Sequence, residues 1–155
     1  MSLERASYHL NLAQHHLNLA GHMLNVLFPM LQENRMLIKI VKELAKSVDN
    51  LIKCSLYYDA YFRKIKISRN PRENYGLFVE WVAPRHFLKN DIKNLVSILK
   101  IEQKHVEAEV DFVRKNKFVI MIGDKYEVLD EVLVRNFFHS VVSCVDNLIG
   151  KLRKV

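Results

Sequence analysis

The apolar and polar positions of residues 8–28 repeat as a heptad written three times, YHLNLAQ, HHLNLAG and HMLNVLF. Positions three and four residues apart share one face of a helix. One apolar stripe with that spacing contains Leu10, Ala13, Leu17, Ala20, Leu24 and Leu27, and a second row starts with Leu12, Leu19 and Val26. A helix that is apolar on two sides needs neighbours on both. The pattern therefore predicts a bundle helix over residues 3–27, ended or kinked by Pro29.

The polar residues of this heptad allow two interpretations. Its three asparagines are either a solvated face, which is favoured, or a buried seam that fixes helix register, as in coiled coils; they are Asn11, Asn18 and Asn25. Its histidines are not three or four residues apart, the spacing that brings metal ligands together on a helix. No metal site is therefore expected. His9 and His16 are predicted to flank the apolar seam, and His15 and His22 to face solvent.

The rest of the chain continues the helical pattern. Apolar positions repeat at helical spacing over residues 33–64, where Leu37, Val41, Leu44, Val48 and Leu51 are expected to point inward. Loop residues and basic residues fill 65–75, a short helix is predicted over 75–83, and Pro84 should close it.

Three more elements are expected towards the carboxyl end. The pattern predicts a helix over 89–110 with inward Ile92, Leu95, Val96, Leu99 and Val106. The run KFVIMI, the turn Gly123-Asp124 and the alternating KYEV indicate a β-hairpin over 117–128. A last helix is predicted over 129–153, with inward Val132, Leu133, Phe137, Val141, Val145, Leu148 and Leu152.

These elements predict the fold class. We expect an all-α antiparallel helical bundle of four main helices and a short helix, with a small β-hairpin before the last helix. The 155 residues are expected to form a single domain, 1–155. Helix 3–27 has more apolar surface than one neighbour covers, which favours a homodimer.

Composition indicates where the protein is located and what kind of partner it binds. No run approaches 18 uninterrupted apolar residues, so no membrane span is expected, and a cytoplasmic protein is favoured. Cys54 and Cys144 stand alone in apolar helical contexts and are expected to be buried free thiols. The net charge of +7 suggests an anionic partner or serves solubility.

Basic residues form three groups that could bind RNA phosphates. The candidate nucleic-acid contacts are Arg63, Lys64, Lys66, Arg69, Arg72, Arg85, Lys89, Arg114, Lys115 and Lys117. Aromatic residues precede the first group and could stack on bases; they are Tyr57, Tyr58, Tyr61 and Phe62. The alternative, which is favoured, is that the aromatics pack at the bundle end and the charges are solvated.

Catalytic motifs are sparse. The sequence has no nucleophile elbow, phosphate-binding glycine loop or HExxH, and no cofactor is expected. The carboxylates Glu102, Glu107, Glu109 and Asp111 are assigned to an exposed arc. Arg135 and His139 lie four apart on one helix face, where His could transfer a proton and Arg could stabilise phosphodiester charge.

The order of elements resembles a family of small archaeal all-helical proteins of unassigned function. The segments HLNLAQHHLNLAGHML, LYYDAYFRKI and VEAEVDFVRKNKFVIMI carry this resemblance. More loosely, the bundle is similar to HEPN-type domains, helical dimeric modules that are often linked to RNA cleavage. Their catalytic pattern is an Arg, a polar residue and a His four to six residues further on. Here Arg135-Asn136 begins it, and the gap to His139 is three residues, one short of the pattern.

Two functions follow from these patterns. The favoured one is a non-catalytic binding or assembly module that contacts RNA or a protein partner through its basic end. The alternative is a HEPN-like, metal-independent ribonuclease that uses Arg135 and His139.

Overall fold

The computed structural model describes residues 3–155 as a mainly helical protein with one small sheet. Helix α1 (Glu4–His22) continues through a π-helical turn (Met23–Leu27) into α2 (Phe28–Leu31). The helix therefore passes through Pro29, whose missing N–H the wider turn just before it accommodates. It ends at Gln32, which adopts the left-handed conformation and donates its N–H to the carbonyl of Phe28.

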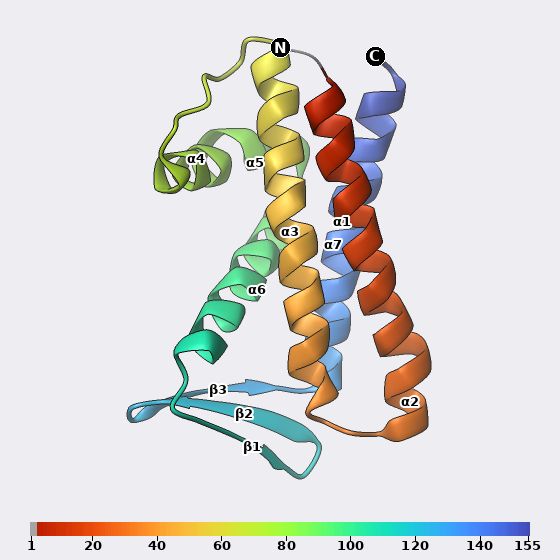
Figure 1. The fold of residues 1–155 in the computed structure, drawn as a ribbon, viewed down its shortest axis with the longest axis vertical. Helices are drawn as coiled ribbons and strands as arrows, with labels where there is room; N and C mark the ends of the chain where they lie inside the picture. The colour runs from red at the N-terminus through yellow and green to blue at the C-terminus, as the bar shows by residue number, and fades with distance from the viewer. Residues whose placement is uncertain (1–2) are drawn as a thin grey trace.

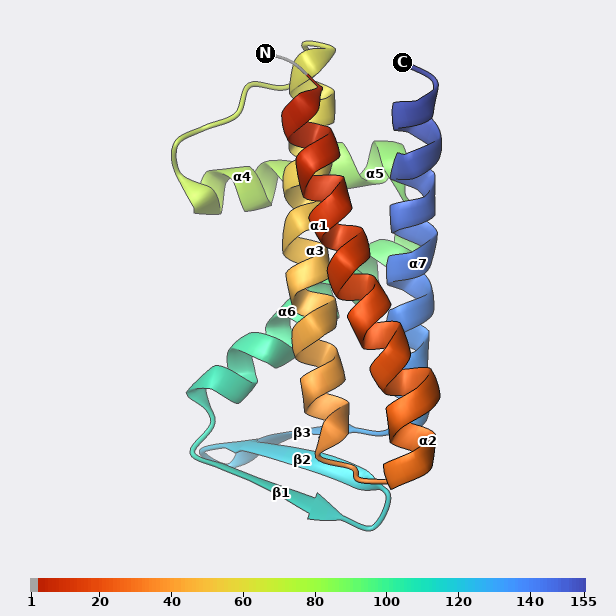
Figure 2. The ribbon, with the colours of Figure 1, turned by 45° about the vertical axis from the view of Figure 1, so that its right-hand side comes forward.

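Helix α3 (Met36–Tyr61) returns antiparallel to α1, as predicted, and α7 (Glu131–Arg153) lies along both. Helix α6 (Lys89–Glu107) crosses this group at a slant in both views (Figures 1 and 2). The Asp130 carboxylate caps α7 by accepting the N–H of Leu133. The four predicted main helices are confirmed, with α3 a few residues shorter at each end than predicted.

The short helical segment begins earlier than predicted. It consists of α4 (Pro71–Leu77), a π-helical turn (Phe78–Val82) and α5 (Ala83–His86). Asn70 starts it, because its side chain accepts the N–H of Arg72 and Pro71 suits the first helical position. The prediction that Pro84 closes this helix is wrong, since Pro84 lies in the first turn of α5.

The predicted hairpin is part of a three-stranded antiparallel sheet. Strand β2 (Lys117–Ile122) pairs with β3 (Lys125–Leu129) around a turn in which Gly123 has a φ of 61°. The other edge of β2 pairs with β1 (Val110–Arg114), with Phe112 opposite Val119. The sequence prediction missed β1, because its five residues carry two charges and the alternation is too short to recognise.

The core lies between α1, α3, α6 and α7 and extends onto the sheet through Phe118, Ile120 and Leu129. The first apolar stripe of α1 is buried, except for half-buried Leu27. Within residues 3–155 of one chain, the second apolar row is left partly uncovered, because Leu19 and Val26 are exposed. The predicted inward positions were wrong for Val106 and Val132, which lie near helix ends and are 66% and 69% exposed.

Polar contacts cross the seam between α1 and α3. His9 Nδ1 lies 3.0 Å from Asn50 Oδ1, and His16 Nδ1 donates to Glu43 Oε2 at 2.9 Å. Between them, the buried Ser47 hydroxyl donates to the Ala13 carbonyl at 2.7 Å. Burial alone would raise the pKa of Glu43, but hydrogen bonds from His16 and Lys46 outweigh it and lower the pKa. As predicted, His15 and His22 are exposed.

The two cysteines are buried and unpaired, as predicted. Burial raises the pKa of the Cys54 thiol to about 12 and raises that of Cys144 as well. Among residues 3–155, no helix is both long enough and apolar enough to cross a membrane.

Candidate functional site

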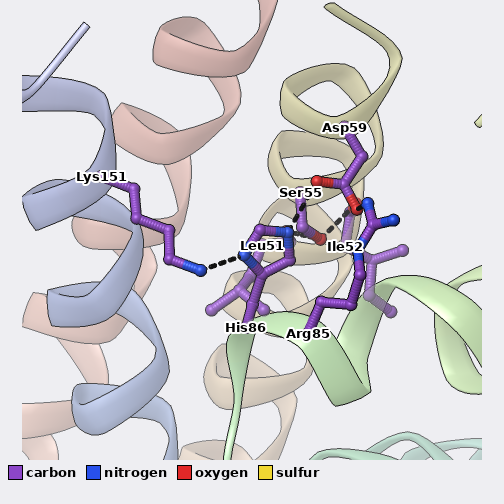
Figure 3. Close-up of polar contacts among 7 residues, drawn as sticks. All are labelled: Leu51, Ile52, Ser55, Asp59, Arg85, His86 and Lys151. Atoms are coloured by element: carbon purple, nitrogen blue, oxygen red, sulfur yellow. Dashed lines mark hydrogen bonds and ion pairs between the residues drawn. The ribbon is translucent and has the colours of Figure 1, made fainter. Parts of the chain in front are cut away.

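A buried carboxylate at the carboxyl end of α3 gathers cationic and imidazole groups from two other helices (Figure 3). Asp59 Oδ1 lies 2.7 Å from His86 Nε2, and both residues are buried. Asp59 Oδ2 accepts a hydrogen bond from the guanidinium of Arg85. On the far side of the imidazole, Lys151 Nζ lies 2.5 Å from His86 Nδ1. The Asp59 cluster therefore joins α3, α5 and α7.

The local sequence explains how Asp59 reaches this place. Asp59 lies four residues after Ser55, on the buried face of α3. The helix then ends in a Schellman-type turn, in which Arg63 adopts a left-handed φ of 58°. The N–H of Lys64 donates to the Asp59 carbonyl at 2.9 Å, and the N–H of Arg63 donates to the Ala60 carbonyl. This turn holds the backbone of Lys64 against the last turn of α3, one turn after Asp59.

Hydrogen-bond directions fix the proton positions in the Asp59 cluster. A charged lysine ammonium can only donate, so His86 Nδ1 accepts from Lys151. The imidazole proton then lies on Nε2 and is donated to Asp59. With a neutral His86, one carboxylate faces the two cations Arg85 and Lys151, and the cluster keeps a net positive charge.

The pKa of Lys151 is affected by the net positive charge of the Asp59 cluster. Desolvation lowers the pKa of the Lys151 ammonium, and repulsion from Arg85 and Lys154 lowers it further, against the attraction of Asp59. The carboxylate is thus already shared among its cationic neighbours. A phosphate that approached this end would meet cations that are not fully neutralised.

Further basic and aromatic side chains lie at the same end. The carboxyl ends of α3 and α7 lie at the same end of the molecule in both views (Figures 1 and 2). We call the following set the basic end: Arg63, Lys64, Arg85, Lys151, Arg153 and Lys154. Tyr61 and Phe62 are both exposed beside it, with ring centroids 5.0 Å apart. Tyr58 packs against Phe62 and against His86, which links the aromatics to the Asp59 cluster.

The structure separates the third predicted basic group from the other two. Lys66, Arg69 and Arg72 follow Arg63 and Lys64 along the loop towards α4, and exposed Lys89 begins α6. The third group lies on the turn between β1 and β2, at the opposite end of the molecule (Figure 1), and contains Arg114, Lys115 and Lys117. The basic residues therefore form at least two surfaces, one at each end of the bundle.

The two candidate catalytic residues share a face of α7 near α1. Arg135 Nε donates to Glu131 at 2.7 Å, and its Nη1 donates to Asn25 Oδ1 at 3.0 Å. The third nitrogen of the guanidinium, Nη2, lies 3.4 Å from the Leu24 carbonyl. His139 is exposed one turn further along. Arg135 thus ties α7 to α1, and His139 is the more accessible of the pair.

Among the predicted carboxylates, Asp111 connects separate elements. Asp111 accepts hydrogen bonds from Arg35 and His105, at 2.8 and 2.9 Å, and so joins the sheet to α3 and α6. Within residues 3–155, no three His, Cys, Asp or Glu side chains gather closely enough to hold a metal ion.

Sequence reasoning missed Asp59 and Lys151 as members of one site. A signal for Asp59 was present, because it occupies a position of the buried stripe of α3, eight residues after Leu51. A buried carboxylate requires partners.

Comparisons with protein-family models, with curated proteins and with solved structures found no match.

Proposed function

We propose that this protein is a non-catalytic module that binds single-stranded RNA through its basic end. The observation that carries the proposal is the Asp59 cluster, in which one buried carboxylate positions Arg85 and, through His86, Lys151. Positioned cations lose little side-chain entropy when they meet a phosphate. Arg153 and Lys154 extend the positive charge along the last turn of α7.

Exposed aromatic rings favour unpaired RNA over a duplex. Tyr61 and Phe62 are 41% and 42% exposed and lie at the same end of α3 as Arg63 and Lys64. Bases stack on such rings only when they are not stacked inside a double helix. Each base–aromatic stack contributes roughly 1–3 kcal/mol. The combination of phosphate-binding cations and stacking rings is typical of surfaces that bind single strands.

Fluorescence anisotropy with labelled single-stranded and double-stranded RNA across a salt series tests the proposal. The paired change Arg153→Gln with Lys154→Gln removes two charges from the basic end. It should weaken single-strand binding and reduce the slope of log affinity against log salt by about 1.4. The matched control, Arg114→Gln with Lys117→Gln, removes the same charge from the opposite end and should leave both quantities unchanged.

A separate variant, Tyr61→Ala, measures how much base stacking contributes to RNA binding. Tyr61→Ala should weaken single-strand binding by five- to a hundredfold, from the ~1–3 kcal/mol of one stack, and leave duplex binding unchanged. Equal losses in both paired variants would show that net charge alone attracts RNA, which would contradict a specific basic end. Absence of binding at low salt would reject RNA and leave a protein partner.

The ribonuclease alternative can be checked in the same tubes. Its supporting observation is that His139 is exposed one turn from Arg135 on α7. RNA cleavage seen on a gel, and lost in His139→Ala, would favour this alternative. The hydrogen bonds from Arg135 to Glu131 and Asn25 favour the non-catalytic function, because they already occupy the guanidinium.

A further inference from the structure

The continuous helix of α1, the π-helical turn and α2 carries a row of exposed apolar side chains. We call it the outer stripe, and it contains Tyr8, Leu12, Leu19, Val26 and Met30. Tyr8 and Met30 are 60% and 75% exposed, and Leu12 is half-buried. The row follows the helix for 22 residues, about 33 Å at the usual rise. A soluble helix ordinarily presents charged residues to solvent along such a face.

Charge is missing from this whole segment. Residues 6–32 contain no Asp, Glu, Lys or Arg, so all 24 basic and 17 acidic residues of the chain lie elsewhere. The exposed polar residues that flank the outer stripe are neutral asparagines and histidines, including Asn18 and His22. A polyanion or an acidic protein would gain nothing from binding here. The complementary surface is another uncharged apolar one.

A second copy of the chain offers that surface. Each copy has a net charge of +7, so two copies repel least where their contact excludes charged side chains. In its sequence spacing, the outer stripe is also symmetric about Leu19. Leu12 and Val26 lie seven residues on either side of it, and Tyr8 and Met30 lie eleven residues on either side.

We infer that the protein forms a two-fold dimer in which the outer stripes of two α1 helices pack antiparallel with Leu19 at the axis. In a contact of this kind the same patch serves both partners. Leu12 of one copy then meets Val26 of the other, and Tyr8 meets Met30. The arrangement covers the apolar row that the fold leaves exposed. The contact is made by uncharged side chains, so it does not depend on RNA binding.

Sedimentation velocity of the full chain between 1 and 100 µM tests the inference. The wild type should sediment as a dimer, and Leu19→Glu should raise the dissociation constant at least a hundredfold, because it places two carboxylates at the axis. The matched control Val106→Glu introduces the same charge at an exposed apolar position on α6 and should leave the dimer intact. A monomeric wild type at 100 µM, or a Leu19→Glu variant as dimeric as the wild type, would overturn the inference.

A cross-linking experiment keeps the test independent of the folding of Leu19→Glu. Cys54 and Cys144 are buried and unpaired, so a new surface thiol can be oxidised selectively. Leu19→Cys should form a disulfide-linked dimer on mild oxidation. Mixed Tyr8→Cys and Met30→Cys chains should cross-link to each other, whereas Tyr8→Cys alone should not. Efficient cross-linking of Tyr8→Cys to itself would exclude the antiparallel arrangement.

The effect of salt concentration distinguishes dimer formation from RNA binding. High salt screens the repulsion between the two positive copies, so the dimer should persist or tighten at 0.5 M NaCl, roughly a 4–5 Å Debye length. RNA binding should weaken over the same range. A dimer that dissociates with rising salt would point to ion pairs and would contradict the uncharged contact.

Discussion

Asp59 Oδ1 accepts the Nε2 proton of His86 at 2.7 Å, across 27 residues of chain, and both side chains are buried. We expect Asp59→Ala to lower the free energy of unfolding by about 1–3 kcal/mol, because a buried imidazole N–H is left without an acceptor. Asp59→Asn, which keeps an acceptor, should cost less. Urea unfolding followed by circular dichroism measures both.

Asp146→Ala is the control for that measurement. Asp146 is exposed on α7, and its removal should change the free energy of unfolding by less than about 0.5 kcal/mol. If Asp59→Ala proves as mild as this control, the Asp59 cluster does not stabilise the fold.

Two helical glycines should respond differently to alanine. A Cβ at Gly150 meets nothing within 4 Å, so Gly150→Ala should raise the free energy of unfolding by about 0.5–1 kcal/mol through helix propensity. A Cβ at Gly21 lies 3.2 Å from the ring of Phe138, which must shift, so Gly21→Ala should gain less. Thermal unfolding ranks the two, and a larger gain at Gly21 would contradict the close approach of α1 and α7.

The turn between β2 and β3 depends on a positive φ at Gly123. Although a Cβ there has open space, an L side chain in this conformation costs about 1–2 kcal/mol. Gly123→Ala should therefore lower the free energy of unfolding by that amount, measured by urea titration. Asp124→Ala, at the next residue of the same turn, should be nearly neutral, and equal losses at both positions would argue against backbone strain.

Stability should depend on pH through Asp111. Hydrogen bonds from Arg35 and His105 hold the pKa of this carboxyl below its ordinary value, although burial opposes them slightly. The unfolded chain therefore binds the proton more readily, and the stabilisation by Asp111 is complete above the ordinary carboxyl pKa and is lost as pH falls through the lowered one. Wild type should exceed Asp111→Asn in stability at pH 7, and the difference should shrink below about pH 4.

Urea titrations of both proteins between pH 7 and pH 3 give this difference directly. Asp124→Asn, at the exposed turn, should track the wild type across the range. A gap between wild type and Asp111→Asn that grows on acidification would reverse the expected sign and exclude the proposed linkage.

The parts of the fold that could be predicted from the sequence are those encoded by local periodicity. The stripe from Leu10 to Leu24 predicts the first helix, and the turn at Gly123 predicts the hairpin of β2 and β3, because each pattern lies within the element itself. Strand β1 escaped detection because its pairing with β2 comes from the sheet and its own five residues carry little pattern. Exposure of Leu19 escaped detection because a heptad shows which face is apolar, while the arrangement of neighbouring helices determines whether that face is covered.

The candidate site was less predictable for a related reason. Arg85 could be recognised as a basic residue, but its contact with Asp59 and the approach of Lys151 depend on how α5 and α7 meet the end of α3. His86 and Lys151 are 65 residues apart in sequence, and no local pattern encodes their contact.

The threefold heptad of α1 could slide along α3 by seven residues, about 10.5 Å, and still present nearly the same apolar profile. The two polar partners on α3, Glu43 and Asn50, share this spacing, so a slide of α1 changes which residues they face. After such a slide in one direction Met23 would replace His16 opposite Glu43, and the half-buried carboxylate would lose a donor, at about 1–3 kcal/mol. The His16–Glu43 contact therefore discriminates against this shifted alignment, which apolar packing alone would tolerate.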